Sequence, residues 1–132
     1  MNITWDDSPP FGRRRTLIAT LNLLADRMTE PQTIVEVGSS EAFSPDGLGN
    51  ALLAFGWYAV RCGARAEAVD VREGAIRNSA AILAQYCPRA VDHVGFHYQD
   101  AFEYVADALD VQHPSYLPGI DLVYYDGPSE PA

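Results

Sequence analysis

Acidic residues or glycine follow short apolar stretches at four points along the chain, and such residues could bind the hydroxyl and amino groups of a small molecule. The stretches span residues 34–38, 66–70, 94–100 and 120–127 and recur at roughly thirty-residue intervals, the length of a βαβ unit. In a parallel sheet with helical crossovers, the C-terminal ends of the strands share one edge, where open α/β sheets bind ligands. The sequence therefore predicts a small-molecule site that is rich in carboxylates and suits hydroxyls and amines more than phosphates.

Apolar periodicity and helix-ending residues predict the elements that position these carboxylates. An irregular lead-in covers residues 1–12, Ser44 and Pro45 start a helix, and Pro31 and Pro88 end two others. We expect strands and helices at the following residues: strands at 33–37, 66–70, 94–98 and 120–125, and helices at 13–28, 45–62, 73–86 and 101–109. This alternation predicts one α/β domain over residues 1–132, a Rossmann-like parallel sheet with flanking helices. For a sheet of this class we expect the strand order 3-2-1-4.

Charge and composition exclude several classes of protein. The formal net charge of the 132 residues is -9, which argues against nucleic acid as a partner because phosphates require clustered positive charge. All nine basic residues are arginine, so the chain has no lysine for a Schiff base or a P-loop. No apolar run is long enough to span a bilayer, and the start lacks the pattern of a signal peptide. We therefore expect a cytoplasmic protein without a membrane partner.

Cysteine and histidine do not form a metal-binding pattern. Cys62 and Cys87 lack the spacing of zinc ligands, so we expect two buried free thiols and no metal site. His97 lies within the third predicted strand, where a histidine with satisfied hydrogen bonds is a stronger interpretation than a catalytic base. His93 and His113 fall in predicted loops and are expected to be exposed.

Three further groups of residues have a structural and a functional interpretation. The arginines at 13–15 are either a solvated helix start or a clamp for an anionic group. Glycines at 47, 49 and 56 serve either close packing of a helix on the sheet or room for a ligand. Phe55, Trp57 and Tyr58 are expected in the core, and the alternation of Tyr124 and Tyr125 would let one of them line a ligand cleft.

Taken together, four motifs resemble those of the class I S-adenosylmethionine-dependent methyltransferases, over about residues 33–128. Residues 35–40 (Val-Glu-Val-Gly-Ser-Ser) resemble the motif after the family's first strand, and residues 68–70 resemble the acidic end of its second strand. Residues 98–101 are similar to the adenine-contacting motif, and residues 122–127 resemble the fourth motif of small-molecule O-methyltransferases. The resemblance implies a methyltransferase that uses S-adenosylmethionine as cofactor and methylates a hydroxyl of a small-molecule substrate.

The resemblance also implies a role for individual residues. The residues implied to bind the cofactor are Glu36, Gly38, Ser39, Ser40, Asp70, Val71, Asp100 and Ala101. Asp70 suits the ribose hydroxyls, because a carboxylate accepts hydrogen bonds from them; the alternative is a solvated carboxylate. Asp100 would contact the adenine amino group, although aspartate is also a good helix N-cap. Asp126 would be catalytic, orienting or deprotonating the acceptor hydroxyl; its alternative is a simple turn.

The chain departs from the family in two respects. Gly38 is followed by Ser39 and Ser40 instead of a full GxGxG pattern, and only four of the family's seven strands can be placed. A fourth strand without a neighbour is an exposed edge. We expect a fragment of a longer methyltransferase, whose C-terminal portion would cover that strand; the alternatives are a domain that pairs with another chain, such as a second copy, and a stand-alone truncated fold. The alternative functions are a non-catalytic Rossmann-like binding domain and, less favoured, an NAD-linked oxidoreductase, because Asp70 suits either ribose.

Overall fold

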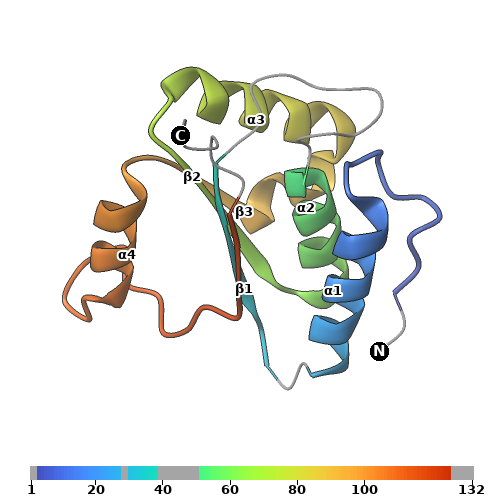
Figure 1. The fold of residues 1–132 in the computed structure, drawn as a ribbon, viewed down its shortest axis with the longest axis horizontal. Coiled ribbons are helices and arrows are strands. Elements are labelled where there is room, and N and C mark those ends of the chain that lie inside the picture. Colours follow the sequence, from blue (N-terminus) through green and yellow to red (C-terminus); the bar gives the residue numbers. More distant parts are fainter. Residues whose placement is uncertain (1–2, 28–29, 39–50, 126–132) are drawn as a thin grey trace, which may run out of the picture.

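A computed structural model describes residues 3–27, 30–38 and 51–125 of the chain (Figure 1). Its elements follow one another in the order α1 (Arg14–Asp26), β1 (Thr33–Val37), α2 (Ala51–Cys62), β2 (Arg65–Asp70), α3 (Glu73–Tyr86), η1 (Pro88–His93), β3 (Val94–Tyr98), α4 (Ala101–Leu109) and β4 (Leu122–Tyr125). The four strands form one parallel sheet in the order β3-β2-β1-β4. The Rossmann-like α/β class and the strand order predicted from the sequence are therefore confirmed.

Most predicted boundaries agree with the structure to within two residues. β4 begins at Leu122 and not at residue 120, and β2 begins one residue early, at Arg65. The short 3-10 helix η1 was not predicted, because Pro88 was interpreted only as the end of α3. Cys87 consequently lies at the junction of α3 and η1 and not within a helix. The predicted start of the helix expected at residues 45–62, with its cap at Ser44, lies outside the described residues.

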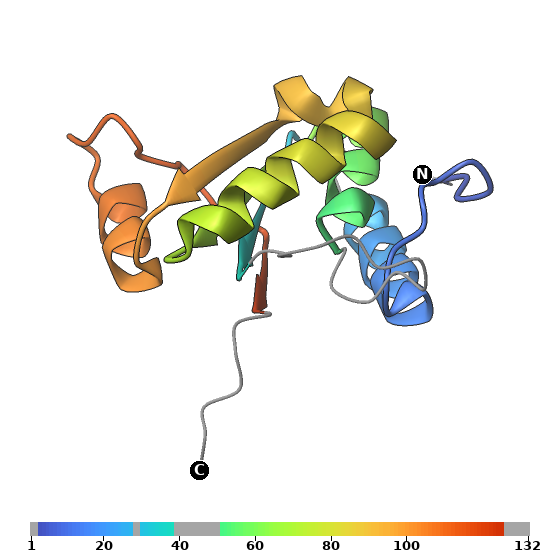
Figure 2. The same cartoon turned by 90° about the horizontal axis from the view of Figure 1, so that it is seen from above.

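The helices cover the two faces of the sheet unequally, as Figures 1 and 2 show. On one face, α1, α2 and α3 pack a large core against alternate strand residues such as Ile34, Ala66 and Tyr124. On the other face, α4 packs a smaller cluster in which Tyr104 and Ala108 meet Val35 and Val69. The alternation of burial follows from the two-residue period of a strand, which sends successive side chains to opposite faces.

Helix α2 lies in the middle of the larger layer and is apolar around almost its whole circumference. Phe55 and Tyr58 are fully buried in it, as the sequence predicted. A Cβ atom at Gly56 would lie 2.9 Å from Ala90 Cβ and 2.9 Å from Leu83 Cδ1, so this glycine permits close packing against η1 and α3. Val94 of β3 lies 4.0 Å from the same Cβ position, so the packing on the sheet that the sequence suggested is present but is looser than the packing against η1 and α3. No helix in the described part of the chain is long and apolar enough to cross a membrane.

Candidate functional site

The C-terminal ends of β1, β2 and β3 meet at one edge of the sheet, where the sequence predicted a ligand site. Gly38 donates its backbone N–H to Val69 O at 2.8 Å, and Gln99 donates to Asp70 O at 2.9 Å. These bonds extend the parallel hydrogen-bond ladder one residue past the end of β1 and of β3. Gly38 has a φ of 93°, a conformation that glycine adopts without the steric penalty of a side chain. The edge therefore brings Gly38 and Asp70 side by side.

Asp70 is buried, with 6% of the residue exposed, and its carboxylate binds the residue two positions later. The backbone N–H of Arg72 donates to Oδ1 at 2.7 Å, and the Arg72 guanidinium donates to Oδ1 at 3.0 Å and to Oδ2 at 2.9 Å. A carboxylate has about four acceptor positions. Arg72 therefore fixes the orientation of Asp70 at the edge, and a ligand that approaches Asp70 must share the carboxylate with this arginine or displace it.

Asp100 is the N-cap of α4. Its Oδ2 accepts hydrogen bonds from the backbone N–H groups of Phe102 at 3.0 Å and Glu103 at 3.2 Å. The capping interpretation of Asp100 is confirmed, and its contact with adenine stays a prediction. Ala101 is the first residue of α4 and therefore directly follows this cap. It is half-buried.

The remaining predicted site residues differ in how they relate to this edge. Glu36 is buried within β1, paired with Ala68 and Tyr124 on its neighbours, one position before the strand ends. Val71 follows Asp70 and is 59% exposed at the edge. Three predicted residues lie outside the described part of the chain: Ser39, Ser40 and Asp126.

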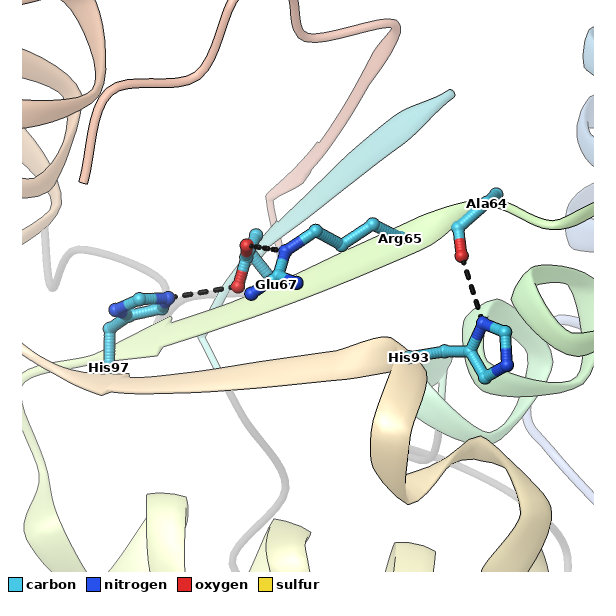
Figure 3. Close-up of polar contacts among 5 residues, drawn as sticks. All are labelled: Ala64, Arg65, Glu67, His93 and His97. Atoms are coloured by element: carbon cyan, nitrogen blue, oxygen red, sulfur yellow. Dashed lines mark hydrogen bonds and ion pairs between the residues drawn. The ribbon is translucent and has the colours of Figure 1, made fainter. Parts of the chain in front are cut away.

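A buried ionic cluster on the α4 face of the sheet was missed by the sequence analysis (Figure 3). Glu67, in the middle of β2, is 2% exposed, and its Oε2 lies 2.9 Å from His97 Nε2 on β3. Because a carboxylate only accepts, this contact places a proton on Nε2. Glu67 Oε1 accepts a second hydrogen bond from Arg65 Nε. His97 thus has a hydrogen-bond partner within the sheet, in agreement with the structural interpretation of this residue.

The electrostatics of this cluster favour a charged Glu67. Burial alone would raise the pKa of Glu67, but the hydrogen bonds from His97 and Arg65 outweigh burial and hold that pKa below its ordinary value. The ring of Tyr104 lies 4.8 Å from the His97 ring, centroid to centroid. Burial, followed by the nearby Glu67 charge, raises the pKa of the Tyr104 hydroxyl. The cluster thus couples β2, β3 and α4 through one negative charge.

Gly95 makes room for the Glu67 carboxylate. The two residues are register partners on neighbouring strands, and a Cβ atom at Gly95 would overlap Glu67 Oε2. A glycine inside a strand often marks the close approach of another group. That signal, together with a carboxylate inside an otherwise apolar strand, could have marked Glu67 as a candidate from the sequence, although not its partner His97.

Two other histidines have contacts that the sequence analysis did not predict. His93, at the end of η1, is half-buried, and its Nδ1 lies 3.3 Å from Ala64 O (Figure 3). His113 Nδ1 accepts a hydrogen bond from the Ser115 backbone N–H at 3.0 Å. The expectation that both are simply exposed loop residues is therefore wrong, because each ring is held by a backbone group.

The arginines at the start of α1 bind groups of their own chain. Arg13 donates to the Tyr124 hydroxyl at 2.9 Å, and Arg14 donates to Trp5 O at 3.0 Å and lies over the Phe11 ring. Tyr124 in turn packs edge-on against Phe55, whereas Tyr125, on the opposite face, is 66% exposed. Two of the three arginines thus help to fix α1 and the lead-in segment.

Neither a search for metal ligands nor comparison with known proteins adds another candidate functional site. Within residues 3–27, 30–38 and 51–125, no group of three or more His, Cys, Asp or Glu side chains could hold a metal ion. Both Cys62 and Cys87 are buried free thiols, as predicted. Comparison with known proteins found no matching family model, no matching curated protein and no matching solved structure. The fold and the edge formed by Gly38 and Asp70 are therefore the features that bear on function.

Proposed function

We propose that the chain is an S-adenosylmethionine-dependent methyltransferase that acts on a hydroxyl group of a small molecule. The observation that carries the proposal is the position of Gly38 and Asp70 beside the point where the chain changes direction. From β1 the chain proceeds to β2 and β3 through α2 and α3 on one face, and it returns to β4 through α4 on the other. Open α/β sheets bind ligands at such a switch point, outside the carboxyl ends of the strands.

The residues at this edge fit the chemistry of the cofactor. Gly38 offers a backbone without a side chain, which permits close approach of a ligand. Asp70 offers a carboxylate next to it for the two ribose hydroxyls. When bound, S-adenosylmethionine supplies an electrophilic methyl group. The resemblance assigns the orientation of the acceptor hydroxyl to Asp126, and the task of that carboxylate would be to position the hydroxyl or take its proton.

A non-catalytic binding domain is the second candidate. The observation that favours it is the Asp70–Arg72 interaction, because a guanidinium that competes with a ribose for the carboxylate would weaken cofactor binding and leave a domain that keeps the fold without transferring a methyl group. An NAD-linked oxidoreductase is a weaker third candidate, supported only by the suitability of Asp70 for any ribose.

Calorimetric titration with S-adenosylhomocysteine, with NAD as the control ligand, tests the proposal. We expect binding of the first ligand alone, and at least a roughly tenfold loss of affinity in Asp70→Ala, since hydrogen bonds to a charged group contribute about 1.5–3 kcal/mol. Asp70→Asn keeps the shape and serves as a second variant if the alanine variant unfolds. Asp92→Ala, at an exposed carboxylate of η1, is the matched control and should bind normally.

The outcomes separate the three candidates. Binding of S-adenosylhomocysteine, followed by methyl transfer to a hydroxylated acceptor, supports the methyltransferase. Binding without transfer to any acceptor supports the non-catalytic domain, and preference for NAD supports the oxidoreductase. A folded protein that binds none of these ligands, or an Asp70→Ala variant that binds S-adenosylhomocysteine as tightly as the unaltered chain, would refute the cofactor assignment.

A further inference from the structure

A cleft separate from the candidate cofactor edge lies between the end of α2 and the junction of α3 with η1. Its cavity volume is about 170 Å³. The walls come from both helices and from η1: Trp57, Val60, Arg61, Tyr86, Pro88 and Arg89. Because α2 and α3 each run back from the C-terminal edge, their last turns lie at the opposite, N-terminal end of the sheet. The cleft is therefore remote from Gly38 and Asp70.

The size and the walls of the cleft suit one aromatic ring. A cavity of about 150 Å³ lined by apolar side chains is large enough to bind benzene. Trp57 and Tyr86 supply aromatic surface, and Val60 and Pro88 supply aliphatic surface. The indole N–H of Trp57 donates to Thr4 O at 3.3 Å, so the polar atom of this side chain has its own partner and the ring remains as an apolar wall.

The charged groups of the cleft are two arginines, and their situation differs from that of three arginines elsewhere in the chain. Arg65, Arg72 and Arg77 each form an ion pair with a carboxylate. Within the residues that the structure describes, neither Arg61 nor Arg89 has a carboxylate oxygen within ion-pair distance. Arg61 instead lies over the Trp57 ring, with its Cζ 3.1 Å from the ring centroid.

The two guanidinium groups also repel each other. The pKa of Arg61 is lowered, first by burial and second by the charge of Arg89, while Asp7 and the two cysteines act weakly in the opposite direction. Guanidinium groups form strong, planar hydrogen-bonded pairs with carboxylates. An anion between them would relieve the repulsion and supply carboxylate acceptors that the described residues do not place on either arginine.

We propose that this cleft binds a monocyclic aromatic carboxylate, with the ring against Trp57 and Tyr86 and the carboxylate on Arg61 and Arg89. The apolar walls select the ring, and the two arginines select the negative charge. The proposal does not depend on the function of the C-terminal edge, because no residue is shared between the two sites.

Calorimetric titration with benzoate, and with benzamide as its neutral isostere, tests the proposal. We expect benzoate to bind at least roughly tenfold more tightly than benzamide, and Arg89→Gln to remove most of that preference, because one charge-assisted hydrogen bond is sufficient for such a difference. Arg61→Gln is the second variant. Arg77→Gln is the matched control. Arg77 lies on α3, the helix that carries Tyr86, but roughly 14 Å from Tyr86 along the helix axis, so this variant should leave benzoate affinity unchanged.

Tryptophan fluorescence locates the bound ligand. The chain has two tryptophans, Trp5 and Trp57, and only Trp57 lines the cleft. A fluorescence change upon addition of benzoate that persists in Trp5→Phe and is lost in Arg89→Gln supports the proposal. Equal affinity for benzoate and benzamide, absence of binding at millimolar benzoate, or normal benzoate binding by both arginine variants would each overturn it.

Discussion

Replacement of Glu67 by glutamine should destabilise the folded protein at neutral pH by about 1–2 kcal/mol. Glutamine has nearly the same shape, so it removes the charge and leaves the packing beside Gly95 unchanged. The glutamine oxygen can still accept from Arg65, and its NH2 group can donate to His97 Nε2 once the imidazole proton is on Nδ1. A hydrogen bond with a charged group contributes about 1.5–3 kcal/mol and a neutral one about 0.5–1.5 kcal/mol, so each of the two contacts weakens by about 1 kcal/mol. The share of Arg65, whose side chain is 55% exposed, is reduced by solvent screening.

The effect of this substitution should depend on pH in a definite direction. The pKa of Glu67 is lowered in the folded protein from its ordinary value of 4.5. A carboxyl group of this kind contributes stability that is fully present above its unfolded pKa and is lost as the pH falls through its folded pKa. The difference in unfolding free energy between the natural chain and Glu67→Gln should therefore be constant above about pH 5 and shrink as acid protonates Glu67.

Urea unfolding, followed by circular dichroism at several pH values, measures this difference. Glu73→Gln is the matched control, because Glu73 pairs with Arg77 on the exposed surface of α3, where the two side chains are 53% and 74% exposed. Such a surface pair contributes only about 0.3–0.5 kcal/mol. The reasoning is refuted if Glu67→Gln is as stable as the natural chain at neutral pH, or if the difference persists unchanged in acid.

Three further substitutions test the packing and capping described above, each by thermal and urea unfolding. Gly56→Ala should cost about 1–3 kcal/mol by overpacking, because its Cβ would lie 2.9 Å from two side chains of α3 and η1; a neutral effect would contradict that packing. Tyr58→Phe removes the hydroxyl that donates to Gln32 Oε1 in the core and should cost about 1–3 kcal/mol by leaving a buried acceptor unsatisfied, whereas unchanged stability would indicate that Gln32 finds another donor. Asp100→Ala should cost about 1 kcal/mol through loss of the N-cap, and Asp100→Ser should recover most of it; failure of serine to do so would argue against capping.

The order and type of the elements could be predicted from the sequence because they depend on local patterns. The short apolar run of β1 and the helical period of α4 can each be read from a short window of the sequence. The strand order 3-2-1-4 was predicted from the alternation of strands and helices together with the resemblance to a known fold. Right-handed crossovers further limit the available arrangements. Neither consideration predicted η1, because proline ends an α-helix and is also accepted in the first turn of a short 3-10 helix.

Contacts between distant residues were decided by the tertiary structure alone. No local pattern around Glu67 indicates that His97, thirty residues later, will donate a hydrogen bond that offsets the cost of burying its charge. That contact depends on the register of β2 and β3. The sequence by itself therefore determined the class of fold and the edge where Gly38 and Asp70 meet. Register and packing determined which carboxylates are bound within the chain, because the partner of a buried charge is chosen in three dimensions.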